Sequence, residues 1–146
     1  FDGSFEYLEK ANFYKKENSN DDHQYRIASI YYKKQNYEQA LVELQILLEN
    51  YPKSPWAEET KFKIIEILYA LNRCPEARQQ YRHFNLDYSN SRFKSEMDFL
   101  VASCLEEEGH LKDAYKRFKS LEGRYTYPAI LKMKLVGIEK RIEKKR

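Results

Sequence analysis

The sequence contains few glycines and few prolines. Only four of each occur in 146 residues, so few positions suit the tight turns on which a sheet-rich fold depends. Cysteine is scarce as well. Cys74 and Cys104 lie thirty residues apart, a spacing that fits neither a zinc motif nor a disulfide framework. We expect two unpaired buried thiols, with a single bridge left open as the alternative.

Long apolar segments are also missing. The densest run, from Ile64 to Leu71, is interrupted by Glu66 and is far shorter than the ~20 residues that a membrane span requires. No secretion signal is visible at the N-terminus. Because the chain starts with Phe1 and not with Met, we expect that a preceding segment has been removed, so the missing signal does not decide the compartment.

No pattern in the sequence carries catalytic chemistry. The chain has no glycine-rich phosphate loop and no Gly-x-Ser-x-Gly turn around a nucleophile. His23, His83 and His110 lie in three different predicted elements, without the spacing of metal ligands. We therefore predict a non-enzyme with no metal, no cofactor and no small-molecule substrate, and keep an enzyme with a hidden site as an alternative. The net charge of +3 is too small to indicate nucleic-acid binding by itself.

A repeat of 37 residues is present instead. Tyrosines 51, 88 and 125 share this spacing, and so do alanines 40, 77 and 114. Such self-similarity is typical of proteins built from stacked units. Four further columns fall in the same register: Ala28, Ile65 and Ala102; Tyr31, Leu68 and Leu105; Leu44, Tyr81 and Phe118; Leu47, Phe84 and Leu121.

Each unit contains two segments with helical periodicity. In the first unit, Ala40, Leu41, Leu44, Leu47 and Leu48 lie on one helix face. The stretch "YPKSP" (51–55) separates two such pairs, with Ser54 as a helix cap and Pro55 in a first turn. The sequence therefore predicts an all-α fold with helices near 22–34, 37–50, 56–71, 75–87, 92–108, 111–124 and 128–145.

We interpret the chain as a single domain over residues 1–146. Three repeats are predicted at 22–58, 59–95 and 96–132. Residues 5–16 are predicted to form a partial helix of an earlier repeat, and 128–146 a basic capping helix that covers the last exposed face.

The repeat pattern resembles tetratricopeptide repeats. Ala28, Tyr31, Ala40, Leu44, Leu47 and Pro52 match the small, aromatic and proline positions of that family. The later units depart from it, with Ile65 at a small position, and with Ser89 and Thr126 in place of proline. The resemblance implies a right-handed superhelix of stacked antiparallel helix pairs. The junction "YPKSPWAEE" is similar to bacterial envelope repeat proteins, namely the outer-membrane assembly lipoprotein (BamD-like) and the Tol-Pal-associated protein (YbgF-like).

The resemblance also implies a concave groove that binds a partner protein, lined by the first helix of each unit. Nine residues occupy the matching positions: Tyr25, Ser29, Tyr32, Phe62, Glu66, Tyr69, Phe99, Ser103 and Glu106. Aromatic side chains there can grip a peptide at a low cost in side-chain entropy. The alternative is that Tyr25, Phe62 and Phe99 pack the first helices against each other.

The C-terminus is strongly basic, with Lys140, Arg141, Lys144, Lys145 and Arg146 close together. Besides the capping role, this segment is a candidate docking element for an anionic membrane surface or an acidic partner. Nucleic acid is disfavoured because no aromatic stacking residue accompanies the basic run.

We hypothesise a non-catalytic scaffold in the bacterial cell envelope, acting in outer-membrane protein assembly or in Tol-Pal-type maintenance. Its partners would be other envelope assembly subunits. Its location would be the periplasm or the periplasmic face of the outer membrane, held there through an upstream lipid anchor or the basic terminus. The alternative is a cytoplasmic chaperone of the type III secretion kind, which cradles an extended substrate.

Overall fold

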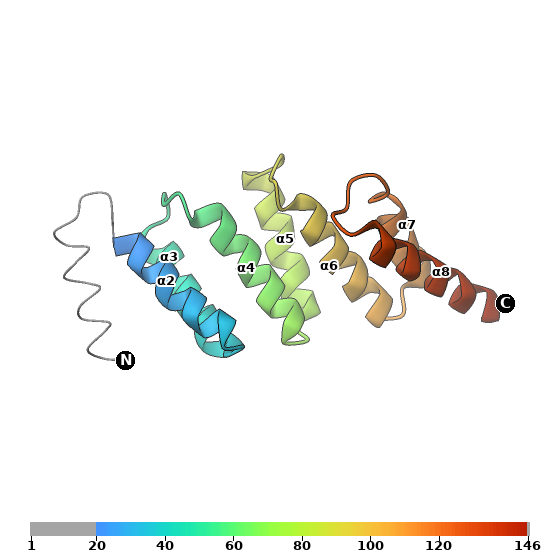
Figure 1. Cartoon of the computed structure of the whole chain (residues 1–146), viewed down its shortest axis with the longest axis horizontal. Coiled ribbons are helices and arrows are strands. Elements are labelled where there is room, and N and C mark those ends of the chain that lie inside the picture. The colour runs from blue at the N-terminus through green and yellow to red at the C-terminus, as the bar shows by residue number, and fades with distance from the viewer. Residues whose placement is uncertain (1–19, 146) are drawn as a thin grey trace. The chain divides into compact units, whose positions relative to one another are not determined.

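The described part of the protein is entirely helical. A computed structural model describes residues 20–145. The predicted partial helix at 5–16 and Arg146 lie outside these residues. No strand occurs within 20–145, so the predicted all-α fold of consecutive helix pairs is confirmed (Figure 1). The helices are α2 (Asn20–Lys33), α3 (Tyr37–Asn50), α4 (Ala57–Ala70), α5 (Cys74–Asp87), α6 (Lys94–Glu107), α7 (Leu111–Lys119) and α8 (Pro128–Lys144).

The helices keep the 37-residue register of the sequence. The first helices α2, α4 and α6 end at Lys33, Ala70 and Glu107, and the second helices begin at 37, 74 and 111. Helix α8 ends at Lys144, which is again 37 residues after Glu107. The predicted capping helix therefore occupies the register of a first helix.

The turns inside the three helix pairs share one backbone conformation. Gln35, Asn72 and Gly109, spaced 37 residues apart, have φ values of 60°, 61° and 88°. After each of them the next amide donates to a carbonyl five residues back, as from Asn36 to Tyr31 at 2.9 Å. These bonds satisfy carbonyls at the helix end, as expected of a left-handed helix cap. Asparagine and glycine adopt this conformation at little cost, whereas Gln35 does so without that advantage.

The junctions between pairs also repeat. The hydroxyl oxygen of Ser54 accepts from the amide of Trp56 at 3.1 Å, and that of Ser91 accepts from Phe93 at 3.0 Å. Each serine thus satisfies an amide that the following helix leaves unpaired. The stretch "YPKSP" is therefore a hinge whose serine helps to start the next helix.

Helix α7 is shorter than predicted. It ends at Lys119, whereas the sequence pattern indicated a helix to residue 124. The Ser120 hydroxyl donates to the carbonyl of Arg117 at 2.7 Å, and Gly123 has φ of 80°. A local side-chain bond and a left-handed residue both favour a turn over a continued helix. The apolar periodicity continues through Leu121 and therefore predicted a longer helix, because it contains no information about this side-chain hydrogen bond.

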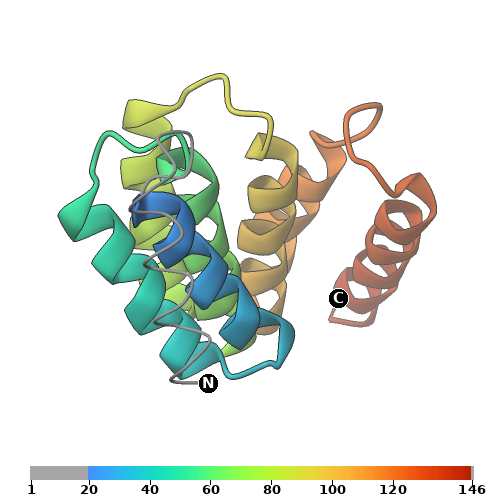
Figure 2. The same cartoon turned by 60° about the vertical axis from the view of Figure 1, so that its left-hand side comes forward.

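The repeated columns form the cores of two compact units, residues up to Ile67 and residues from Leu68 onwards. In the first unit, α3 returns beside α2 (Figure 2). Ala28 and Ala40 are completely buried. In the second unit, α8 packs against α7, and α6, α7 and α8 share one apolar cluster. Burying one large apolar side chain stabilises a fold by about 1.5–3 kcal/mol, so the buried members of these columns contribute substantially to stability. The cluster consists of Ala102, Leu111, Ala114, Phe118, Leu121, Leu131, Leu135 and Ile138.

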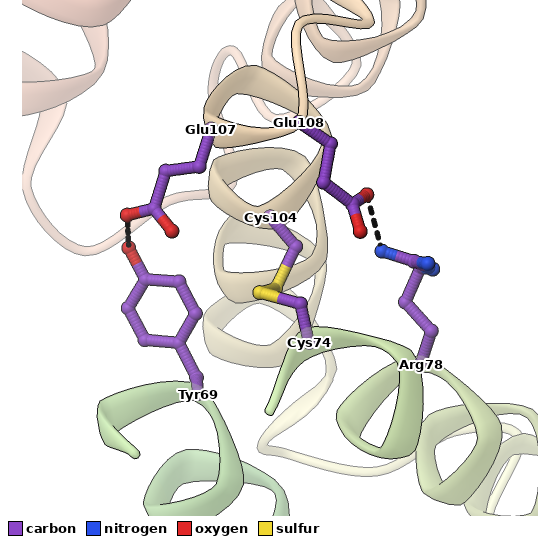
Figure 3. Close-up of a disulfide and its surroundings, with 6 residues drawn as sticks. All are labelled: Tyr69, Cys74, Arg78, Cys104, Glu107 and Glu108. Atoms are coloured by element: carbon purple, nitrogen blue, oxygen red, sulfur yellow. Dashed lines mark hydrogen bonds and ion pairs between the residues drawn. A yellow bond between two sulfur atoms is a disulfide. The ribbon is translucent and has the colours of Figure 1, made fainter. Parts of the chain in front are cut away.

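The two cysteines form a disulfide, so the prediction of unpaired thiols is wrong. Cys74 begins α5 and Cys104 lies in the last turn of α6, with their Cα atoms 5.7 Å apart (Figure 3). Because α6 runs back along α5, the start of one helix meets the end of the other. A separation of thirty residues is therefore compatible with direct contact, which counting along the chain does not show.

Candidate partner-binding surface

In the first unit, hydrogen bonds join the first helices α2 and α4 along their length. Tyr32 donates to Glu66 at 2.8 Å, and Tyr25 donates to Glu59. Both pairs are separated by 34 residues, three fewer than the repeat. The offset means that a residue of α2 faces a residue of α4 that lies three positions, or about one helical turn, before its own repeat equivalent. The sequence prediction included Tyr25, Tyr32 and Glu66 as groove residues but did not include Glu59.

Tyr32, Lys63 and Glu66 form a partly exposed polar cluster. The Lys63 Nζ atom lies 4.3 Å from the centre of the Tyr32 ring, within the range of a cation–π contact. Burial, and then the hydrogen bond to Glu66, raise the pKa of Tyr32 well above its ordinary value. The hydroxyl therefore remains a donor at any physiological pH. The cluster offers a flat ring, a cation and a carboxylate to a partner.

Tyr25 and Phe62 offer little surface to a partner. Each is 8% exposed, and the Tyr25 ring stacks on the Trp56 ring with 4.1 Å between their centres. Ser29, on the same helix as Tyr25, is half-buried. This packing agrees with the alternative in which Tyr25 and Phe62 hold helices together. The binding role of the three residues stays a prediction.

In the second unit, Phe99 and Ser103 are also committed to packing. The Phe99 ring stacks on Tyr125 with 4.4 Å between ring centres and meets Phe118 edge-on at 5.1 Å. Ser103 is 2% exposed. Tyr69 is more accessible, and its hydroxyl donates to Glu107 at 3.2 Å (Figure 3). Burial, and then the nearby Glu107 charge, raise the pKa of Tyr69.

Glu106, another predicted groove residue, is held by two cations of α8. Lys134 Nζ lies 2.9 Å and an Arg141 guanidinium nitrogen 2.7 Å from its carboxylate oxygens. The Glu106 side chain is 15% exposed. Lys134 and Arg141 are seven residues apart, which places them on one face of α8 two turns from each other. That spacing was the sequence signal for this contact, and the groove prediction missed it because it considered only the first helices of the three repeats.

These contacts engage one residue of the predicted basic C-terminal surface and leave others without a carboxylate partner in the part of the chain that the structure describes. Arg141 is paired with Glu106, whereas Lys140, Lys144 and Lys145 are exposed and have no carboxylate partner among the described residues. Arg146 lies outside the described residues.

Two of the open cavities in the second unit are not lined by any predicted groove residue. The larger, of about 490 Å³, is bounded by the junction before α6 and by Arg124. The smaller, of about 260 Å³, lies at the α6–α7 turn, where Ile142 and Lys145 approach. Within residues 20–145 no three His, Cys, Asp or Glu side chains converge as metal ligands would. None of the helices described there combines the length and the apolarity needed to span a bilayer.

The tetratricopeptide repeat family matches residues 24–54 of the chain. The matched segment holds α3, the part of α2 from Gln24 onwards and the "YPKS" hinge. A comparison with curated proteins found no match. The family match and the helix pairs that continue its register support a tetratricopeptide-repeat protein. Such repeats typically act as non-catalytic modules that bind other proteins.

Proposed function

We propose that the chain is a non-catalytic scaffold that binds a partner protein through the first helices of its repeats. The observation that carries the proposal is the repetition of one helix pair in a fixed register, with a tetratricopeptide match at its start. In tetratricopeptide-type repeats, stacked helix pairs bury their apolar faces against each other, and side chains of the first helices remain accessible to a partner protein. The predicted groove residues Tyr32 and Glu66, together with the neighbouring Lys63, form a partly exposed cluster of mixed chemistry.

We further propose that the scaffold works in the bacterial cell envelope, in outer-membrane protein assembly or Tol-Pal-type maintenance, with other envelope subunits as partners. Two observations support this location. One is the junction "YPKSPWAEE", which is similar to envelope repeat proteins. The other is the buried disulfide between Cys74 and Cys104, because disulfides persist in oxidising compartments such as the periplasm and are rare in the cytosol. The same bridge speaks against the cytoplasmic chaperone alternative.

Photo-crosslinking tests the binding surface. A benzoylphenylalanine residue is placed at Ser29, on the predicted binding face of α2, and in a matched variant at Gln45, an exposed position of α3. We expect a crosslinked partner from the Ser29 variant and little or none from the Gln45 variant. In the Ser29 background, Tyr32→Ala should weaken the crosslink while the helical circular dichroism is retained. Equal crosslinking from both positions would contradict binding through the first helices.

Thiol trapping tests the compartment. Cells that produce the chain naturally are quenched in acid, and denatured extracts are treated with a high-mass maleimide before and after reduction. Chain from an oxidising compartment should shift in a gel only after reduction, because both cysteines are bridged. A cytosolic protein with two thiols serves as the control and should shift without reduction. If the chain behaves like this control, the envelope location is wrong.

A further inference from the structure

Helix α8 presents an apolar face to solvent in addition to its buried one. Of the six large apolar side chains that are exposed among the described residues, four lie on this helix or directly before it. Their exposed fractions range from 41% to 74%, although soluble proteins usually scatter such residues singly. The residues are Tyr127, Ile130, Met133 and Val136.

Basic residues continue this face along the helix. Met133, Lys140 and Lys144 lie at i, i+7 and i+11, which places them on one side of α8, with the half-buried Gly137 between them. We call the six residues Tyr127, Ile130, Met133, Val136, Lys140 and Lys144 the α8 outer face. With Lys132 and Lys145, the segment carries four cations that have no carboxylate partner among the described residues.

One of the two carboxylates of α8 is engaged by α7. Glu139 accepts a hydrogen bond from the Tyr115 hydroxyl of α7 at 2.6 Å and is thus held towards the protein. Glu143 is the only other acidic residue of the helix. The outer face therefore combines apolar side chains at its start with unpaired positive charge at its end.

Another helix of the repeat stack is a poor cover for α8. The 37-residue register places Glu139 in the column of Ala28, Ile65 and Ala102, which is buried in every earlier pair. In α2 the small Ala28 lets the second helix approach closely. A long charged side chain at this position keeps a second helix away, because its burial without a counter-ion would be costly. A second helix is thus a poor cover for the side of α8 that carries Glu139.

We propose that the α8 outer face docks on an anionic lipid bilayer. A helix lying in the membrane interface buries apolar side chains at the boundary of the headgroups and acyl chains, and it places Lys and Arg near lipid phosphates. The Tyr127 phenol suits the headgroup level, and Ile130, Met133 and Val136 supply the apolar contact. A bilayer surface offers negative charge to Lys140 and Lys144 at once, whereas a protein partner would need one acidic group for each.

Vesicle flotation with the complete chain tests the proposal. The vesicles contain phosphatidylcholine alone, or phosphatidylcholine mixed with phosphatidylglycerol, at low ionic strength. We expect binding to the mixed vesicles and not to phosphatidylcholine alone. Replacing Lys140 and Lys144 by Gln should lower the partition coefficient about 30-fold, on the basis of a typical contribution of each cation near such a surface. Replacing Ile130 and Met133 by Ser should lower it about tenfold or more.

Matched control variants distinguish docking through the α8 outer face from nonspecific attraction between the protein and the vesicles. Leu86→Ser removes an apolar side chain of α5 that is 83% exposed. Arg82→Gln combined with Lys116→Gln removes two charges from exposed positions of α5 and α7. Both controls should keep at least half of the wild-type binding, and all variants should keep the wild-type thermal midpoint. Failure to bind mixed vesicles, or equal losses in the controls and the α8 variants, would overturn the proposal.

Discussion

Removal of the disulfide is the perturbation with the most definite expected magnitude. The bridge closes a loop of thirty residues that contains α5, the following junction and most of α6. In the chain-entropy model, closing such a loop in the unfolded chain stabilises the folded state by about 3.6 kcal/mol. Because Cys74 and Cys104 are both buried, Cys→Ala at the two positions also removes a small amount of packing. We therefore expect the double variant to lose about 3–4 kcal/mol of unfolding free energy.

Urea unfolding followed by circular dichroism measures this loss. With a slope of about 2 kcal/mol per molar urea, the midpoint should fall by about 2 M. Each single Cys→Ala variant should lose nearly as much as the double variant, because either change removes the whole bridge. Wild-type protein treated with dithiothreitol should approach the same stability, whereas the double variant should not respond to the reductant.

Amide hydrogen exchange locates the effect. Protection should decrease in α5 and α6, whose ends the bridge joins, and should be retained in α2 and α3 of the first unit. A loss below about 1 kcal/mol would refute the loop-closure argument. So would an equal loss of protection in α2 and α3, because it would show that the bridge does not act on the second unit specifically.

Two further predictions concern polar contacts of the second unit. Glu106→Gln should lower the unfolding free energy by about 1 kcal/mol, because Lys134 and Arg141 lose their common partner, and thermal melts should show a smaller difference in high salt. Tyr81→Phe should cost about 2 kcal/mol in urea unfolding at neutral pH, because the buried Asp98 carboxylate loses a hydrogen-bond donor. Burial, and then that hydrogen bond, raise the pKa of Tyr81 from 10.0 to about 12, so the folded state holds the phenol proton more tightly than the unfolded chain. The stability that Tyr81 supplies to the wild type should thus be complete below pH 10.0 and should decline as the pH rises towards about 12. In the same pH series, Tyr81→Phe should show a shallower decline in unfolding free energy. An identical decline in both proteins would contradict this assignment.

The helical class and the register could be read from the sequence because they depend on local spacing. The alanine column of Ala40, Ala77 and Ala114 is almost completely buried, as the period of the pattern indicated. Helix α3 has the predicted bounds, because a cap at Asn36 and the breakers after Tyr51 mark both of its ends. Helix α7 does not, because a side-chain hydrogen bond at Ser120 ends it before its apolar periodicity does.

The candidate site was only partly accessible from the sequence. Tyr32 and Glu66 lie on neighbouring first helices and form a hydrogen bond, but column matching gave no information about which columns remain accessible. Tyr25 and Phe62 share the register of groove residues and are nevertheless packed, because neighbouring side chains cover them. Accessibility depends on the partners of a residue, and those partners, such as Trp56 and Glu59 for Tyr25, lie at separations that differ from the repeat period.

The sequence by itself determined the repeating helix pair, since hydrophobic periodicity, caps and breakers act within a few residues of each other. Only the tertiary structure decided that Cys74 meets Cys104, that Glu106 is neutralised by α8, and that α8 keeps a second apolar face exposed. Each of these depends on the rotation and direction of one helix relative to its neighbour. That rotation is set by the packing of many side chains together, and no short stretch of the chain encodes it.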